Sequence, residues 1–188
     1  MDLRIRPCTE HDIAQFAPLQ PEGWQPIEPM FRFFRYQPFC FPHIAELDGK
    51  IVATSNGIQN EKSAWLSHII VAPGYRRMGI GTQVTDSILK YMQGRANKSI
   101  LLIATEFGEH LYPKFGFKNV GLYNFYMGDN HLSHAPDKVV VPQANRVVNE
   151  YLRSLGYEFL SSAPRMVLQK DVRWKPRMLF SRVGGWYG

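Results

Sequence analysis

The sequence has few cysteines and no long apolar run. Its 188 residues contain two cysteines, Cys8 and Cys40, which cannot build the disulfide framework of a small secreted domain. There is no run of about 18 apolar residues that could span a membrane. Charged residues interrupt the first ten positions, where a signal peptide would carry an apolar core. We therefore expect a cytoplasmic protein with no membrane partner.

Acidic residues are also in short supply. Sixteen Asp and Glu face 22 Lys and Arg, which gives a formal net charge of +6 and a pI of about 9.4. Such an excess favours anionic partners. However, the basic residues are scattered, with the densest groups at 173–182 and 76–77, and no nucleic-acid-binding signature is present. The charge therefore predicts a small-anion site and no nucleic-acid partner.

The first 127 residues alternate between strand and helix patterns. The turn pair Asp48-Gly49 between two strand-like runs is a strong hairpin signal. A third strand, 64–73, completes an antiparallel meander. An amphipathic helix over 82–95 should then bury Val84, Ile88, Leu89, Tyr91 and Met92, before an apolar strand at 99–105, a short helix at 108–117 and a further strand. The fold class is mixed α/β (α+β) with a partly antiparallel sheet.

Proline and aromatic residues concentrate in residues 20–42. The segment favours a short or broken helix with loops. Its rings could form a satellite core, or an aromatic wall over a substrate groove, and the sequence leaves both interpretations open. The aromatic residues are Trp24, Phe31, Phe33, Phe34, Tyr36, Phe39 and Phe41.

The stretch "YRRMGIG" at 75–81 has the glycine spacing of a phosphate-binding loop. A Walker loop would need a lysine after Gly81, and none follows. A dinucleotide fingerprint would need a third glycine where Val84 stands, and a parallel strand before the loop. The remaining interpretation is an acyl-coenzyme A loop, in which glycine amides converge on a pyrophosphate at a helix N-terminus.

This loop resembles the Arg/Gln-x-x-Gly-x-Gly/Ala signature of the GNAT superfamily of N-acetyltransferases. Arg76, Gly79 and Gly81 fill the three defining positions. The stretch "ATEFGEHLYPKFGF" at 104–117 resembles a later GNAT motif that ends in Leu-Tyr-x-x-Phe/Leu-Gly-Phe. The resemblance covers residues 1 to about 127. It implies a mostly antiparallel splayed sheet flanked by helices.

The resemblance also implies a set of site residues, with acetyl-coenzyme A as co-substrate and no metal. Tyr112 would lie near the thioester sulfur and act as general acid. Backbone groups would pair with the pantetheine arm and the loop would hold the pyrophosphate. The residues implied to pair with the pantetheine arm are Ile69, Ile70 and Val71. Those implied to hold the pyrophosphate are Arg76, Arg77, Met78, Gly79, Ile80, Gly81 and Thr82.

The general base is less well marked. The position that many GNAT enzymes give to a glutamate falls here on Trp65. Ser67 lies on the same strand face, and His68 on the other face unless a bulge intervenes. His68 is the candidate base. A structural role for this histidine remains open, as does a base made of waters or none at all.

These features predict an N-acetyltransferase that moves an acetyl group to a primary amine by direct attack. The acceptor would be a small molecule or a peptide. The alternative is a non-catalytic acyl-CoA-binding or regulatory module, favoured by the missing glutamate.

The C-terminal residues extend past a plain acetyltransferase domain. We expect a catalytic domain at 1–128, a linker at 129–138 and an extension at 139–188. His131 and His134 read as part of a solvated linker and not as metal ligands. The extension has the strand–helix–strand plan of a degenerate half GNAT unit, as in bacterial two-domain GNAT proteins. It should pack on the first domain's sheet or form a homodimer.

Overall fold

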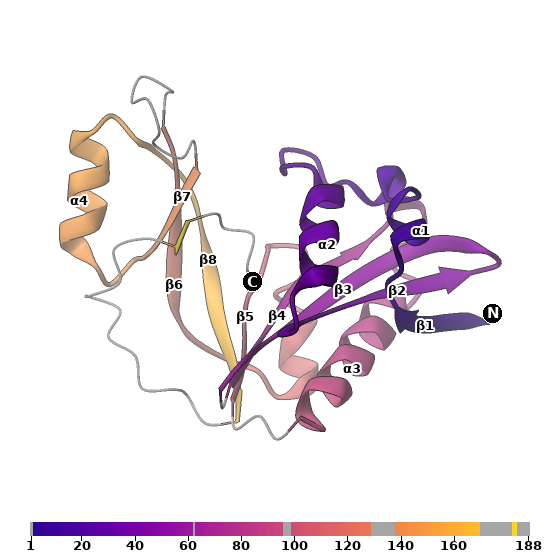
Figure 1. The fold of residues 1–188 in the computed structure, drawn as a ribbon. Helices are drawn as coiled ribbons and strands as arrows, with labels where there is room; N and C mark the ends of the chain where they lie inside the picture. Colours follow the sequence, from indigo (N-terminus) through magenta and orange to yellow (C-terminus); the bar gives the residue numbers. More distant parts are fainter. Residues whose placement is uncertain (1, 62, 96–98, 129–137, 170–181, 184–188) are drawn as a thin grey trace. The chain divides into compact units, whose positions relative to one another are not determined.

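The computed structural model of the chain contains two compact units, residues 1–100 and 101–188 (Figure 1). None of the helices in the described parts of the chain is long and apolar enough to cross a membrane. The structure describes residues 2–61, 63–95, 99–128, 138–169 and 182–183.

The first unit is built on an antiparallel meander in the strand order β1-β2-β3-β4. The predicted hairpin is confirmed: Asp48 and Gly49 both have positive φ, 50° and 76°, as a two-residue primed turn requires. Its four strands are β1 (Leu3–Pro7), β2 (Cys40–Leu47), β3 (Lys50–Asn60) and β4 (Ser63–Val71).

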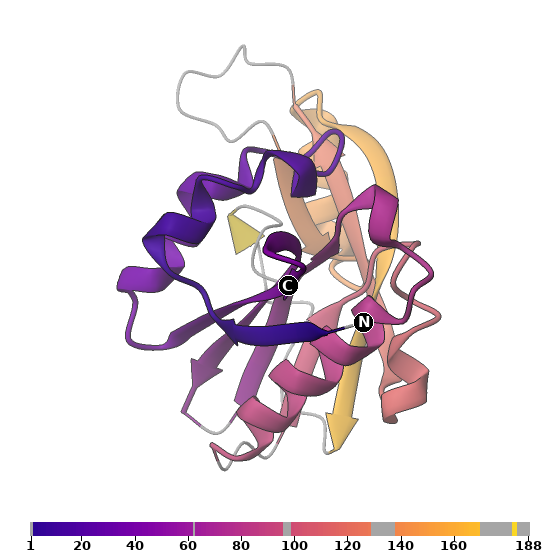
Figure 2. The same cartoon turned by 90° about the vertical axis from the view of Figure 1, so that its right-hand side faces the viewer.

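Helices cover both faces of this meander. α1 (Glu10–Ile13) and α2 (Ile27–Tyr36) lie on one face, and α3 (Ile80–Gln93) lies on the other (Figures 1 and 2). α3 buries the predicted apolar side chains except Tyr91, which is 40% exposed, while Thr85 is buried instead. The prediction for Tyr91 was wrong because this residue lies at the margin of the buried stripe.

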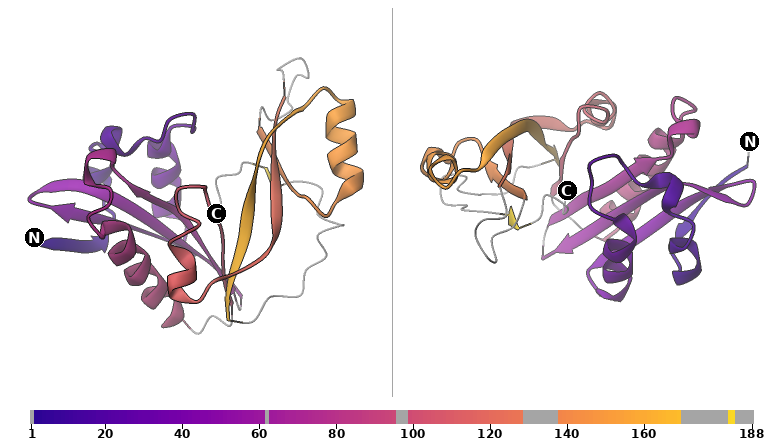
Figure 3. Two further views of the ribbon diagram at one scale, coloured as in Figure 1. Left: turned by 180° about the vertical axis from the view of Figure 1, so that it is seen from behind. Right: turned by 90° about the horizontal axis from the view of Figure 1, so that it is seen from above.

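The second unit contains the strands β8-β6-β7-β9 and the last three residues of β5, which crosses the boundary between the units. α4 (Arg146–Ser154) packs on β6 and β7 (Figure 3). β6 pairs antiparallel with both β7 and β8. The linker predicted at 129–138 lies between β6 and β7, which pair with each other. The division into domains stays a prediction. These strands are β5 (Ser99–Ile103), β6 (Lys118–Met127), β7 (Lys138–Pro142), β8 (Glu158–Gln169) and β9 (Arg182–Val183).

The helix expected at 108–117 is only a short 3₁₀ turn, η3 (Tyr112–Phe115). Pro113 lies near its start, and Gly116 ends it with a φ of 86°. Proline lacks a backbone donor, and a left-handed glycine terminates a helix. These two residues explain why the segment does not extend into a longer helix.

Candidate active site

The predicted phosphate loop joins β4 to α3 through the short 3₁₀ turn η2 (Pro73–Tyr75). Arg77 and Gly79 have positive φ, 63° and 77°, so the chain reverses sharply just before α3 begins at Ile80. No side chain of the described residues caps this helix end. Its first amide groups therefore have no intrahelical acceptor and carry the positive end of the helix dipole.

The side chains of this loop separate into two kinds. Arg76 and Arg77 are exposed, and the Arg76 Nε donates to the Val71 carbonyl at 3.2 Å. Ile80, by contrast, is 1% exposed and packs against Val84 and the sheet. Ile80 thus anchors the loop and offers a ligand only its backbone N–H. The loop has the backbone shape and charge that suit a pyrophosphate.

A β-bulge in β4 decides where His68 points. Thr54 pairs with Ile70 and Asn56 with Ser67, so β4 has one residue more than β3 between these pairs. His68 lies in this interval with a φ of 51°. Its ring contacts two rings of α2, which places it on the α2 face of the sheet. The bulge on which the sequence-based prediction depended is present.

The same face carries Ser67. The Asn56 Nδ2 donates to the Ser67 Oγ at 3.3 Å, and the Asn56 Oδ1 accepts from the Phe41 N–H at 3.1 Å. Asn56 was missed from the sequence because a single asparagine in an apolar strand carries no motif. Its only sequence signal is its polarity within β3.

His68 is enclosed by aromatic rings. The ring centroids of Phe34, Phe31 and Trp24 lie 5.1, 5.7 and 6.0 Å from that of His68, all close to edge-on. His68 is 5% exposed, and neither ring nitrogen has a hydrogen-bond partner in the part of the chain that the structure describes. Burial lowers the pKa of His68 to about 4. The imidazole is therefore neutral at physiological pH.

Within the aromatic segment 20–42, the side chains of α2 are buried on one face of the helix and exposed on the other. Phe31 and Phe34 are fully buried, whereas Phe33 and Tyr36 are 43% and 76% exposed. The buried rings belong to the core and also surround His68. The core interpretation therefore holds for Phe31 and Phe34. The wall over a substrate groove stays a prediction.

Tyr112 belongs to the second unit. It is 7% exposed, and its ring meets Phe117 edge-on at 5.9 Å. A β-carbon on Gly108 would lie 3.2 Å from the Tyr112 Cε2 and 3.4 Å from its hydroxyl oxygen, so this glycine gives the ring its space. Burial raises the pKa of Tyr112 to about 12. The phenol therefore keeps its proton at neutral pH.

A comparison of the sequence with models of protein families identifies the family to which the chain belongs. The model of the acetyltransferase (GNAT) family matches residues 8–117. The chain belongs to the GNAT acetyltransferase family. Membership implies an acyl-CoA-dependent acetyltransferase, and the uncapped start of α3 behind Gly79 fits the pyrophosphate of acetyl-CoA.

Solved structures share the GNAT fold at low identity. A protein from Pyrococcus horikoshii described as an acetyltransferase has a TM-score of 0.83 at 18% identity, covering 99% of this chain and 96% of that one. The ribosomal-protein-S18-alanine N-acetyltransferase of Escherichia coli has a TM-score of 0.61 at 14% identity, covering 93% and 97%. The PaiA N-acetyltransferase of Thermoplasma acidophilum, in complex with coenzyme A, has a TM-score of 0.53 at 16% identity, covering 64% and 92%. Comparison with curated proteins gives no match.

The comparisons give no support for a second GNAT unit in this chain. The family match ends at residue 117, while the P. horikoshii structure aligns along 99% of the chain. β8 completes the sheet by pairing with β6, which explains the strand–helix–strand plan without a second unit. The predicted degenerate half unit is replaced by strands β7 and β8 with α4.

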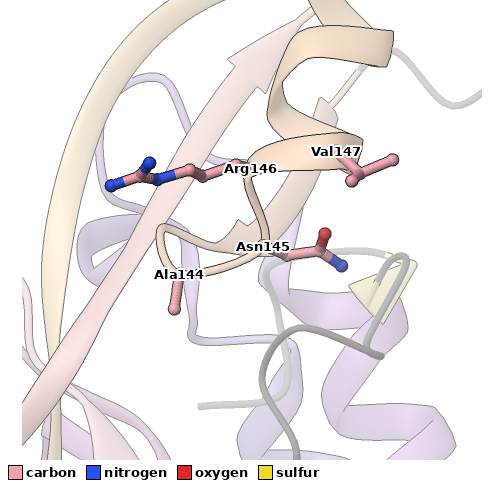
Figure 4. A pocket seen from close by; sticks show the side chains of 4 residues that line it. All are labelled: Ala144, Asn145, Arg146 and Val147. Atoms are coloured by element: carbon pink, nitrogen blue, oxygen red, sulfur yellow. The ribbon is translucent and has the colours of Figure 1, made fainter.

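A hollow of about 530 Å³ opens at the start of α4, lined by Ala144, Asn145, Arg146 and Val147 (Figure 4). The Asn145 side chain accepts the Val148 N–H at 3.3 Å and so caps the helix. This end of α4 therefore differs from the uncapped start of α3. Within the described residues, no group of three or more His, Cys, Asp and Glu could hold a metal, and His131 and His134 lie outside those residues.

Proposed function

We propose that this GNAT protein transfers the acetyl group of acetyl-CoA to a primary amine of a small molecule or a peptide by direct attack. The observation that carries the proposal is the uncapped N-terminus of α3 behind the left-handed residue Gly79. Such a helix start binds a pyrophosphate through backbone amides and the helix dipole.

The residues proposed to hold the co-substrate come from β4 and the loop. Backbone groups of Ile69 to Val71 would pair with the amides of the pantetheine arm. The amides at 79–82 would face the pyrophosphate, and the exposed Arg76 and Arg77 would add charge. The bound thioester supplies the acetyl group and a thiolate leaving group.

The nucleophile must arrive as a neutral amine. A lysine-like amine with a pKa of about 10.4 pays roughly 4–5 kcal/mol for this at pH 7, whereas an α-amine near 7.7–8 needs only about 1 kcal/mol. As the amine nitrogen bonds to the carbonyl carbon, the carbon–sulfur bond breaks. We propose that His68 or water receives the amine proton, and that Tyr112 donates one to the thiolate.

One observation favours the alternative, an acyl-CoA-binding module without catalysis. A histidine whose pKa is lowered to about 4 is a weak base. The position that many GNAT enzymes give to a glutamate is occupied here by Trp65. Thiol release from acetyl-CoA with a panel of amines separates the two functions. Turnover supports the transferase, and tight coenzyme A binding with no turnover on any amine supports the module.

The role of the loop is tested separately. Arg76→Glu should abolish binding of coenzyme A under either function. Unchanged affinity in this variant would show that the loop assignment is wrong. Tyr112→Phe serves as its counterpart, since it should bind coenzyme A normally.

Pairing with another copy of the chain stays a prediction. Strands β7 and β8 already pair with β6 within the chain. Sedimentation of the full chain at several concentrations measures its mass directly. A monomer at all concentrations would contradict the homodimer.

A further inference from the structure

The arrangement around His68 leaves its two ring nitrogens without the partners that buried polar atoms normally have. A buried imidazole with no hydrogen bond lowers stability, and such groups in folded proteins usually have a role or a missing partner. His68 is 5% exposed, and Phe31, Phe34 and Trp24 surround it. We call these four side chains the His68 cluster.

Trp24 is the one member of the His68 cluster that belongs to a loop. It is partly exposed, whereas the other three members are buried. The preceding residue, Gly23, has a φ of 71°, which permits a sharp turn there. Phe31 and Phe34 are fixed on α2, and His68 is fixed in β4. An entering molecule would therefore reach His68 by displacing Trp24.

The side chain of Gln20 joins several backbone groups of this loop. Its Nε2 donates to the carbonyls of Pro21, Trp24 and Gln25, each at 3.1 Å. Its Oε1 accepts the Ile27 N–H at 3.0 Å, at the start of α2. The Trp24 N–H also donates to the Pro21 carbonyl at 3.3 Å, and residues 21–26 contain no helix or strand. The Gln20 bonds join the loop to itself and to the start of α2, and not to a strand.

The absence of charged groups from the His68 cluster limits the class of molecule that could bind there. The His68 cluster contains no carboxylate, ammonium or guanidinium group. Arg32 and Arg35 of α2 pair with Glu10 instead. A cationic polyamine or a phosphorylated amine would enter this cluster without a counter-charge, which disfavours both. A neutral aromatic ring would instead repeat the edge-on contacts that Trp24 makes.

We propose that the acceptor of this protein is a small aromatic amine, uncharged at neutral pH, whose ring replaces that of Trp24 and whose N–H donates to His68. This inference rests on the proposed transferase function and names its substrate class. A neutral imidazole offers one acceptor nitrogen for this bond. The acceptor loses one proton and the thiol gains one, so an uncharged amine needs no strong base.

The test compares aniline with cyclohexylamine, which have the same six-carbon ring but differ in aromaticity and in the charge on nitrogen. Thiol release from acetyl-CoA by the full chain is measured with both, and with spermidine and an amino sugar phosphate. We expect kcat/KM for aniline to exceed that for each of the other three at least tenfold. A higher value for any of the charged amines would overturn the proposal.

Three variants test whether the preference for aniline depends on the His68 cluster. His68→Phe keeps an aromatic ring but removes the acceptor, and should lower kcat/KM for aniline at least tenfold. Trp24→Ala should lower KM severalfold with little change in kcat, because the acceptor no longer displaces an indole. Tyr36→Ala removes an exposed ring on the outer face of α2 and should change neither. Equal kinetics for His68→Phe and wild type would overturn the proposal.

A binding measurement separates this inference from the proposed function. Aniline without acetyl-CoA should shift the imidazole ¹⁵N signals of His68 in the wild-type chain, and cyclohexylamine should not. A shift without thiol release from any amine would refute the transferase while supporting the aromatic site. Thiol release with charged amines and no shift would support the transferase and overturn this inference.

Discussion

The hydroxyl of Thr54 donates a hydrogen bond to the backbone carbonyl of His68 at 3.0 Å. This bond joins β3 to β4 at the residue that β4 has in excess. It holds the carbonyl of a left-handed residue that ordinary strand pairing does not accommodate. The position of the His68 ring therefore depends on a side chain of the neighbouring strand.

Replacing Thr54 tests this dependence. Thr54→Val keeps the side-chain shape and removes the donor, and should lower the free energy of unfolding by about 1–3 kcal/mol. Thr54→Ser keeps the donor and should lose clearly less. Chemical denaturation measures both values. Equal stability of the serine and valine variants would show that the hydrogen bond does not fix the bulge.

Gly79→Ala should weaken coenzyme A binding. The glycine has a φ of 77°, and no described atom lies within 4 Å of an added β-carbon, so the effect acts through backbone conformation alone. A left-handed alanine costs about 1–2 kcal/mol, which corresponds to roughly a tenfold loss of affinity if the loop relaxes away from this shape. Titration calorimetry with coenzyme A measures the change.

Gly74→Ala is the matched control for this loop. Gly74 also has open space around its Cα, but its φ is not positive. Coenzyme A affinity should stay within twofold of the wild-type value. A similar loss in both variants would mean that the backbone shape at Gly79 is not what binds the co-substrate.

The stability of the first unit should fall in mild acid because of His68. Its pKa is about 4 in the folded chain, against about 6.5 when unfolded, so the unfolded state binds the proton first. The stabilisation is complete above pH 6.5 and is lost as the pH falls toward 4, by about 3 kcal/mol. The loop and the helix whose aromatic rings surround His68 also carry four charged residues, Glu22, Glu28, Arg32 and Arg35.

The comparison for this prediction is His68→Phe. Denaturant titrations of both proteins between pH 4 and 7 give their stabilities. The wild-type value should decrease more steeply with falling pH than that of the variant. Parallel curves would show that His68 is not the buried titrating group in this range.

Tyr112→Phe should lower kcat and leave coenzyme A affinity unchanged. The variant keeps the ring packing against Phe117 and Gly108 but has no phenolic proton. Loss of a general acid typically costs a factor of 10²–10⁴. Because burial raises the pKa of Tyr112 to about 12, wild-type activity should show no loss from phenol ionisation below pH 10. Unchanged kcat in the variant would remove Tyr112 from the mechanism.

Asn149 should be the polar residue on which α4 most depends. Its Oδ1 accepts from the Asn124 Nδ2 at 2.7 Å and the Tyr126 hydroxyl at 2.8 Å, and its Nδ2 donates to the Pro142 and Asn145 carbonyls. Asn149→Ala leaves several buried groups unpaired and should destabilise the second unit by about 3 kcal/mol or more. Asn119→Ala, at an exposed position, should cost under about 1 kcal/mol. Thermal unfolding separates the two.

The local elements could be predicted from the sequence because short-range rules determine them. Asp48-Gly49 marks a hairpin, and both residues have the positive φ that such a turn requires. The glycine loop was found because its backbone shape, with a positive φ at Gly79, suits only certain residues. The pairing of β6 with β8 could not be predicted, since it depends on contacts between distant parts of the chain.

The candidate site could be predicted only in part, because it also depends on contacts between distant parts of the chain. The direction of the His68 ring depends on a bulge, and one extra residue in a strand changes which face each side chain takes. The roles of Gln20 and Asn56 arise from bonds to backbone groups that no motif records. The sequence predicts a co-substrate role for the loop at 75–81 and leaves the acceptor side undetermined.

The pairing of β6 with β8 also sets the order in which this chain can fold during synthesis. Lys118 pairs with Val167, 49 positions further along. Until residues 158–169 have left the ribosome, β6 has an open edge on that side, and open edges of this kind invite aggregation. A chain ending at residue 128 would keep all the residues that match the family, including the loop at 75–81. It would nevertheless leave both edges of β6 without a partner strand. Strands β7 and β8, within residues 138–169, therefore cover both edges of β6.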